Sequence, residues 1–202
     1  MTKSFLRDAK VLDTAVQLIR LGARPPVVDA LTSIGQEKAV RLYREILGKA
    51  PPKGQLPSLG RWYIRSVNSG HSAYFLHVYE DIVAKSGCSV VDGLISAYRI
   101  YLSYPWNDGS EGLSFDRAWW LVRLFQIDGL VKVRCVTCNC YSVTEANEAR
   151  SRYICYFCRS RQKKFGVKPV RKEKLLFSQI YPDNEILSLV NNDAPNDGTK
   201  ED

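Results

Sequence analysis

The chain has 202 residues, of which 45% are apolar and 11% aromatic, and its formal net charge is +8. The length suits one domain, or one domain with a small module, and the composition excludes a disordered chain. No apolar run reaches the roughly 20 residues of a membrane span, and charges interrupt the N-terminus where a signal peptide would need an apolar stretch. We therefore expect a cytoplasmic protein without a membrane partner, in which clustered cysteines bind metal rather than form disulfides.

Three short helices are predicted at the N-terminus. Apolar residues recur at helical spacing over residues 8–21. Pro25 suits the first turn of a second helix, where its missing N–H is not needed. A third helix, with Thr32 or Ser33 as its N-cap, should end at Gly48.

Residues 26–45 also fit a helix-turn-helix motif. Such motifs place a small residue where the helices cross, then a tight turn, then an apolar anchor, and Ala30, Ile34 and Val40 occur in that order, although Ile34 stands where glycine is usual. The second helix would expose cations suited to phosphates or guanine edges: Lys38, Arg41 and Arg44. On a helix that only packs in a bundle, the same cations would be a solvated face, and the sequence leaves both interpretations open.

A segment rich in proline and glycine, residues 49–60, separates these helices from the rest. Three further helices are predicted, over residues 72–85, 89–103 and 116–127. Short β-like pieces at 131–135 and 151–155 then surround the cysteines. Aromatic residues in or beside the helices are expected in the core, although a protein-interaction scaffold would use them as partner surface; they are Tyr98, Tyr101, Trp106, Trp119 and Trp120.

Four cysteines form two C-x2-C pairs, Cys135 with Cys138 and Cys155 with Cys158. Two intervening residues let a tight turn aim both sulfurs at one ion, and four thiolates complete a tetrahedron without an open position. This pattern predicts a structural zinc site, with iron–sulfur ligation as the alternative. Cys140 is the expected non-ligand, because only one residue separates it from Cys138.

The charge is unevenly distributed. Residues 131–182 hold twelve Lys or Arg against three Glu, whereas residues 183–202 hold six acids against one Lys. Zinc with four thiolates would lower the formal charge of the chain to about +6. The asymmetry favours a polyanionic partner, with nucleic acid first. The candidate DNA-binding cations beyond the cysteines are Arg161, Lys163, Lys164, Lys168, Arg171, Lys172 and Lys174.

These patterns predict a mainly α protein in three parts. Residues 1–130 form a helical domain with the helix-turn-helix-like segment, and residues 131–182 form a small zinc-ribbon-like basic module. Residues 183–202 are expected to be a disordered acidic tail. An enzyme with a structural zinc is the weaker alternative, because the two histidines, His71 and His77, belong to no catalytic motif.

Several blocks together resemble one family. LIRLGAR (18–24), RLYREILG (41–48), PPKGQLP (51–57), AYRIYL (97–102), RAWWLVR (117–123) and the two C-x2-C pairs occur in that order. Together they resemble FlhC, the partner subunit in the flagellar master regulator FlhDC, from about residue 8 to about residue 165. RWYIRSVNSGHSAYFLHVYED (61–81) departs most from the family pattern.

The resemblance implies a largely helical protein that binds one structural Zn²⁺ through Cys135, Cys138, Cys155 and Cys158. It implies a hetero-oligomer with an FlhD-type subunit, expected to be a hexamer. It also implies that the complex binds promoter DNA and activates flagellar operons with RNA polymerase. No small-molecule substrate is expected, and the family's DNA contacts are not assigned to positions of this chain.

Overall fold

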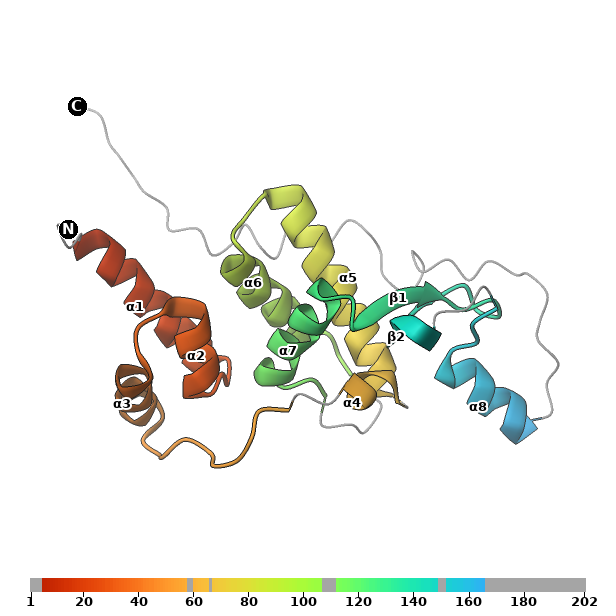
Figure 1. Cartoon of the computed structure of the whole chain (residues 1–202), viewed down its shortest axis with the longest axis horizontal. Helices are drawn as coiled ribbons and strands as arrows, with labels where there is room; N and C mark the ends of the chain where they lie inside the picture. The colour runs from red at the N-terminus through yellow and green to blue at the C-terminus, as the bar shows by residue number, and fades with distance from the viewer. Residues whose placement is uncertain (1–4, 58–59, 66, 107–111, 149–151, 166–202) are drawn as a thin grey trace.

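The computed structural model describes residues 5–57, 60–65, 67–106, 112–148 and 152–165. Within these ranges the chain is mainly helical with one small sheet (Figure 1). Its elements in chain order are α1 (Phe5–Arg20), α2 (Pro25–Thr32), α3 (Gln36–Leu47), α4 (Gly60–Ile64), α5 (Asn68–Ser86), α6 (Val90–Ser103), α7 (Phe115–Gln126), β1 (Leu130–Arg134), β2 (Tyr141–Glu145), a 3-10 turn (Ala146–Glu148) and α8 (Tyr156–Phe165). None of these helices is long and apolar enough to cross a membrane.

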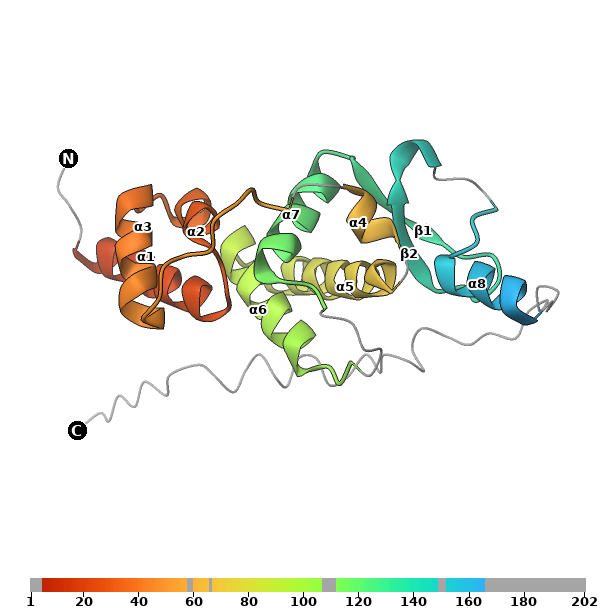
Figure 2. The ribbon, with the colours of Figure 1, turned by 90° about the horizontal axis from the view of Figure 1, so that it is seen from below.

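Helices α1, α2 and α3 pack on one another at one end of the molecule (Figures 1 and 2). Leu18, Val27 and Ala39 are fully buried between them. The turn between α2 and α3 contains Gly35 at φ 91°, a conformation that costs a residue without Cβ little. The carboxylate of Asp29 accepts a hydrogen bond from the Gly35 N–H at 2.8 Å, which fixes this turn.

The predicted cap of the third helix is wrong. Gly35 is the N-cap of α3 and gives no side-chain hydrogen bond, whereas Ser33 ends α2 in the left-handed conformation. Ser33 therefore lies at the end of α2 and does not cap the start of α3. Ala30, which the helix-turn-helix prediction placed at the crossing, is exposed.

The centre of the molecule is the packing of α5 against α6, with α7 across both. Its interior is aromatic, and Phe75, Tyr98 and Phe115 meet edge to face. Tyr98, Tyr101 and Trp119 are buried, and Trp106 and Trp120 pack against the same core, as the core prediction expected.

A buried polar chain runs through this core. His71 is fully buried, and its Nδ1 lies 2.7 Å from the Tyr101 hydroxyl. The same hydroxyl accepts a hydrogen bond from the Leu113 N–H at 2.6 Å, and the Tyr98 hydroxyl donates to the Leu113 carbonyl at 2.9 Å. His71 is thus a hydrogen-bonded core residue.

One ion pair ties the N-terminal helices to α7. Arg24 Nε lies 2.5 Å from Asp116 Oδ2, and only 15% and 8% of the two side chains are exposed. The Arg24 backbone N–H donates to the other carboxylate oxygen at 3.0 Å, and Arg24 Nη2 donates to the Gln55 carbonyl at 3.0 Å. Both charges are therefore paired and hydrogen-bonded, which a buried ion pair requires.

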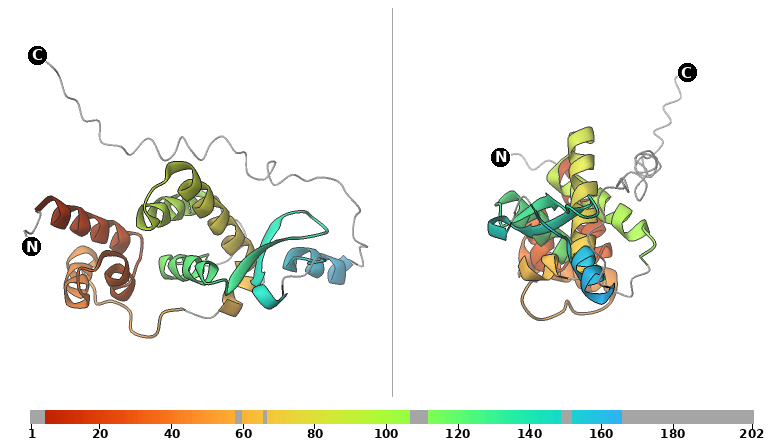
Figure 3. Two further views of the ribbon diagram at one scale, coloured as in Figure 1. Left: turned by 45° about the horizontal axis from the view of Figure 1, so that its top comes forward. Right: turned by 90° about the vertical axis from the view of Figure 1, so that its right-hand side faces the viewer.

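Strands β1 and β2 form an antiparallel hairpin, with Leu130 opposite Glu145 and Arg134 opposite Tyr141. The hairpin lies beside α5 (Figure 3). Leu130 and Val143 are fully buried in the common core, and Lys132 pairs with Glu80 of α5. The predicted β-like piece at 151–155 is wrong over its described residues, 152–155, which form no strand, and the partner of β1 is Tyr141–Glu145 instead.

Candidate metal centre

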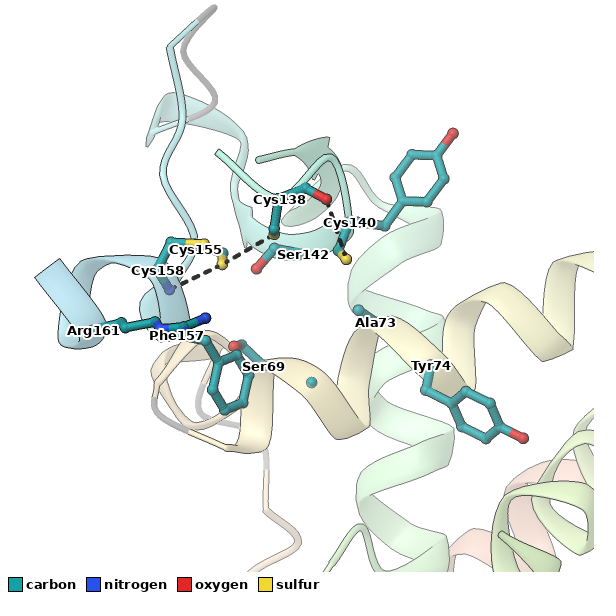
Figure 4. A pocket seen from close by; sticks show the side chains of 12 residues that line it. Ser69, Ala73, Tyr74, Cys138, Cys140, Ser142, Cys155, Phe157, Cys158 and Arg161 are labelled. Atoms are coloured by element: carbon teal, nitrogen blue, oxygen red, sulfur yellow. Dashed lines mark hydrogen bonds between the residues drawn. The ribbon is translucent and has the colours of Figure 1, made fainter. Parts of the chain in front are cut away.

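The structure brings four thiols to one point. The sulfurs of Cys135, Cys138, Cys155 and Cys158 all lie within 4.8 Å of one another. Figure 4 shows three of these cysteines, and the sulfurs of Cys138 and Cys155 are 3.8 Å apart. Zn–S bonds of about 2.3 Å in a tetrahedron place the sulfurs roughly 3.8 Å apart. The donor set and its spacing therefore fit a closed tetrahedral metal site.

The hairpin supplies the first pair. The Asn139 N–H donates to the Cys135 carbonyl at 2.9 Å, and Asn139 adopts φ 61°, which asparagine tolerates better than most residues. The Cys135 N–H in turn donates to the Cys140 carbonyl at 3.0 Å and continues the strand ladder. The Thr137 N–H points at the Cys135 sulfur at 3.4 Å, an arrangement that stabilises a thiolate.

The start of α8 supplies the second pair. Cys155 immediately precedes the helix, and Cys158 lies in its first turn, where the helix dipole favours negative charge. The Cys158 N–H points at the Cys155 sulfur at 3.5 Å. The Cys155 N–H reaches the Cys135 sulfur at 3.3 Å and joins the two pairs.

The surroundings shift the pKa values of three of these thiols in different directions. Hydrogen bonds from Cys140 and then Cys155 lower the pKa of the Cys138 thiol. The hydrogen bond to Cys138, followed by burial, raises the pKa of the Cys155 thiol, and burial raises the pKa of the Cys158 thiol to about 12. A divalent cation at the centre reverses this balance, because it stabilises all four thiolates.

The fifth thiol has a different role. The Cys140 thiol lies 3.6 Å from the Cys138 carbonyl and does not belong to the four-sulfur set. The Cys140 carbonyl instead accepts the hydrogen bond from the Cys135 N–H that closes the hairpin. Cys88 lies far from this cluster in the chain and packs half-buried against the helical core.

The predicted DNA-binding cations lie at two separate places. Lys38, Arg41 and Arg44 are exposed on α3, and Arg41 pairs with Glu37 at 2.6 Å. Arg161 is exposed on α8, at the opposite end of the molecule (Figures 1 and 2). Lys163 and Lys164 belong to the later part of α8, whereas Lys168, Arg171, Lys172 and Lys174 lie outside the described residues.

Sequence reasoning missed how the cysteine cluster rests on the helical body. A cavity of about 350 Å³ separates the cluster from α5 and is lined by Ser69, Ala73, Phe157 and Arg161 among others (Figure 4). The Phe157 ring lies so close to Gly70 that a Cβ there would be 3.3 Å from it. Phe157 is one of the two aromatic residues inside the second C-x2-C pair in the sequence, but the sequence did not indicate its contact with Gly70.

Comparison with known proteins adds the family. A family model described as flagellar transcriptional activator (FlhC) matches residues 1–169. A flagellar transcriptional regulator FlhC from Gallionella capsiferriformans (strain ES-2) is 38% identical over 160 residues, 77% of this chain and 87% of that protein. A second FlhC, from Verminephrobacter eiseniae (strain EF01-2), is 38% identical over 157 residues, which cover 77% of this chain and 85% of that protein. A third FlhC, from Proteus mirabilis, is 34% identical over 158 residues, which cover 77% of this chain and 82% of that protein.

Proposed function

The chain belongs to the FlhC family of flagellar transcriptional regulators, and from this premise we propose that it is the DNA-binding subunit of a transcriptional activator. It acts with an FlhD-type partner in a hetero-oligomer, a hexamer in our proposal. The complex binds promoters of flagellar operons and recruits RNA polymerase. The family is one of transcriptional regulators rather than enzymes.

A structural Zn²⁺ held by Cys135, Cys138, Cys155 and Cys158 is part of this proposal. The single observation that carries it is the lack of burial in α8: none of its side chains from Tyr156 to Arg161 is buried. Among these described side chains the helix has no buried apolar face, and the contact of the half-exposed Phe157 with Gly70 is a small one. Four thiolates on one ion would join it to the hairpin, and the ion supplies that cross-link when bound.

The zinc module would bring cations to the duplex. Arg161 is exposed on α8, and the chain continues from there into Lys163, Lys164, Lys168, Arg171, Lys172 and Lys174. Contacts from such side chains to phosphates supply affinity that falls steeply with salt. The proposal of a separate zinc-binding basic module, residues 131–182, rests on this charge and on the cysteine cluster.

The α2–α3 segment is the candidate for base reading. Its short turn and the exposed Lys38, Arg41 and Arg44 support a helix-turn-helix role. The exposure of Ala30 departs from the usual motif, in which that residue is covered by the second helix. The scaffold alternative loses support because Tyr98, Tyr101 and Trp119 are buried and present no partner surface.

The proposal is tested on the chain purified with an FlhD-type partner. We expect one zinc per chain and binding to flagellar promoter DNA whose affinity falls steeply between 50 and 200 mM salt, on the order of 10³-fold or more for six or more phosphate contacts. A stable complex that carries no zinc would contradict the metal site. A zinc-loaded complex that does not prefer promoter DNA over random DNA would contradict the regulator function.

A further inference from the structure

A second hollow, of about 410 Å³, lies between the end of α4 and the zinc module. It is bounded by the residues that follow α4, by β2, and by the segment that enters α8. Two arginines line it, Arg65 and Arg159, together with the tyrosines Tyr153 and Tyr156. The remaining lining residues are neutral, so the hollow holds two positive charges and no carboxylate.

No carboxylate among the described residues forms an ion pair with either guanidinium group. Arg65 is exposed and forms no ion pair in the part of the chain that the structure covers. Arg159 makes one long contact, 3.4 Å from its Nη2 to the Ile154 carbonyl. By contrast, Arg24 and Arg41 lie 2.5 Å and 2.6 Å from carboxylate oxygens. Arg65 and Arg159 therefore keep donors available for an anionic ligand.

The walls of the hollow are anchored. The Arg159 N–H donates to the Cys155 carbonyl at 3.0 Å, so the cysteine cluster sets its position. The Tyr153 carbonyl accepts from the Val136 N–H at 2.9 Å, inside the turn that holds the first cysteine pair. On the other wall, Arg65 directly follows α4, whose buried Tyr63 donates to the Arg117 carbonyl at 3.1 Å. The backbone on both sides of the hollow is therefore held in place, and only the two arginine side chains have to be ordered when a ligand binds.

We propose that this hollow binds one phosphate of the DNA backbone between Arg65 and Arg159. Planar guanidinium groups match phosphate oxygens with paired hydrogen bonds, and tyrosine hydroxyls are also common phosphate donors. Arg161, two residues after Arg159 on α8, is also exposed. The inference rests on the proposed DNA-binding function and adds a contact point that the cysteine spacing and the basic run did not indicate.

The test uses the complex with the FlhD-type partner and compares the double variant Arg65→Gln/Arg159→Gln with wild type. Loss of one phosphate contact should lower promoter affinity about eightfold at 0.1 M salt and reduce the slope of log K against log salt by about 0.9. Arg20→Gln, an exposed arginine at the end of α1, is the matched control and should change neither quantity. Zinc content is measured for each variant.

Neutral phosphate analogues in the DNA distinguish the loss of a phosphate contact from a structural effect of the substitutions. Neutral methylphosphonates are placed one at a time along the promoter. At one position wild type should lose about eightfold in affinity, and the double variant should lose nothing further there. If the double variant loses zinc, the single variant Arg65→Gln replaces it, because Arg65 is remote from the cysteines in the chain. The methylphosphonate at that position should then lower the affinity of Arg65→Gln less than that of wild type.

Three outcomes overturn the inference. Unchanged affinity and slope in the double variant would refute the phosphate contact while leaving the regulator function intact. Binding of inorganic phosphate by wild type, with DNA affinity unchanged in the variant, would assign the hollow to a small anion instead. Failure of the wild-type complex to bind promoter DNA would refute both the proposed function and this contact.

Discussion

Among single residues, Cys138 and Cys140 show how two neighbouring thiols can differ in role. The Cys138 sulfur belongs to the four-sulfur cluster, whereas the Cys140 thiol faces the Cys138 carbonyl at 3.6 Å. We predict that Cys140→Ser retains one zinc per chain and that Cys138→Ser loses it, because three thiolates leave the tetrahedron open. Metal content after dialysis measures this, and equal zinc loss in both variants would show that Cys140 is a ligand.

The Arg24–Asp116 pair makes a second prediction at this scale. Asp116→Ala leaves a largely buried guanidinium without its partner, which should lower the free energy of unfolding by about 3 kcal/mol. Glu37→Ala removes an exposed ion pair with Arg41 and should change the free energy of unfolding by less than about 1 kcal/mol. Urea denaturation of both variants gives the comparison. A similar, small effect of the two substitutions would mean that Arg24 finds other partners, such as the Gln55 carbonyl.

The individual site residues were predictable to different degrees. The cysteine spacing predicted which four sulfurs meet, because C-x2-C geometry is local. The shared hollow of Arg65 and Arg159 could not be predicted, because its lining residues at the end of α4 and around the start of α8 are about 90 residues apart in the sequence.

At the level of elements, the close approach of α5 and α6 can be tested at Gly93. A Cβ at Gly93 would lie 2.8 Å from Val83 Cγ2 of α5, so the two helices must separate to accept it. We predict that Gly93→Ala lowers the free energy of unfolding by about 1–3 kcal/mol, although alanine is the better helix former.

Gly60→Ala is the matched control for that substitution. Gly60 begins α4, and a Cβ there meets no atom within 4 Å. It should leave stability unchanged or raise it slightly, by up to about 1 kcal/mol. Thermal or urea unfolding of both variants decides the matter. If Gly93→Ala were as stable as Gly60→Ala, the α5–α6 contact would be looser than the structure has it.

The dependence of α8 on metal is the second prediction for an element. Because none of its side chains from Tyr156 to Arg161 is buried, removal of zinc should release α8 while the aromatic core around α5 and α6 stays folded. Hydrogen exchange should become fast in residues 155–165 on chelation and stay slow in residues 72–82. Unchanged protection of α8 after complete zinc removal would contradict this dependence.

Helices and strands differed in how far sequence predicted them. The long amphipathic helices α1, α6 and α7 were predicted within a few residues, since their apolar faces repeat at helical spacing. The piece at 131–135 was predicted, whereas the strand β2 that pairs with it was not, because strand pairing depends on the turn rather than on local pattern. The helix α8 was not predicted, since it has no buried stripe among its described side chains to give a period.

For the molecule as a whole, the distribution of charge matters more than its total. The cations of α3 and of α8 lie at opposite ends, with the helical core between them (Figures 1 and 2). Because the two sets are far apart, we expect them to contact separate parts of a long DNA site. The overall helical class could be predicted from composition and periodicity, whereas this separation depends on tertiary packing.

The central claim is that a structural zinc ion positions the basic module for DNA binding. The most direct test measures promoter affinity of the complex with its FlhD-type partner across salt concentrations, before zinc removal, after it, and after zinc is restored. We predict that removal lowers affinity at least tenfold and flattens the salt dependence, because phosphate contacts are lost, and that added zinc restores both. A zinc-free, intact complex that binds with the same affinity and the same salt dependence would contradict the claim.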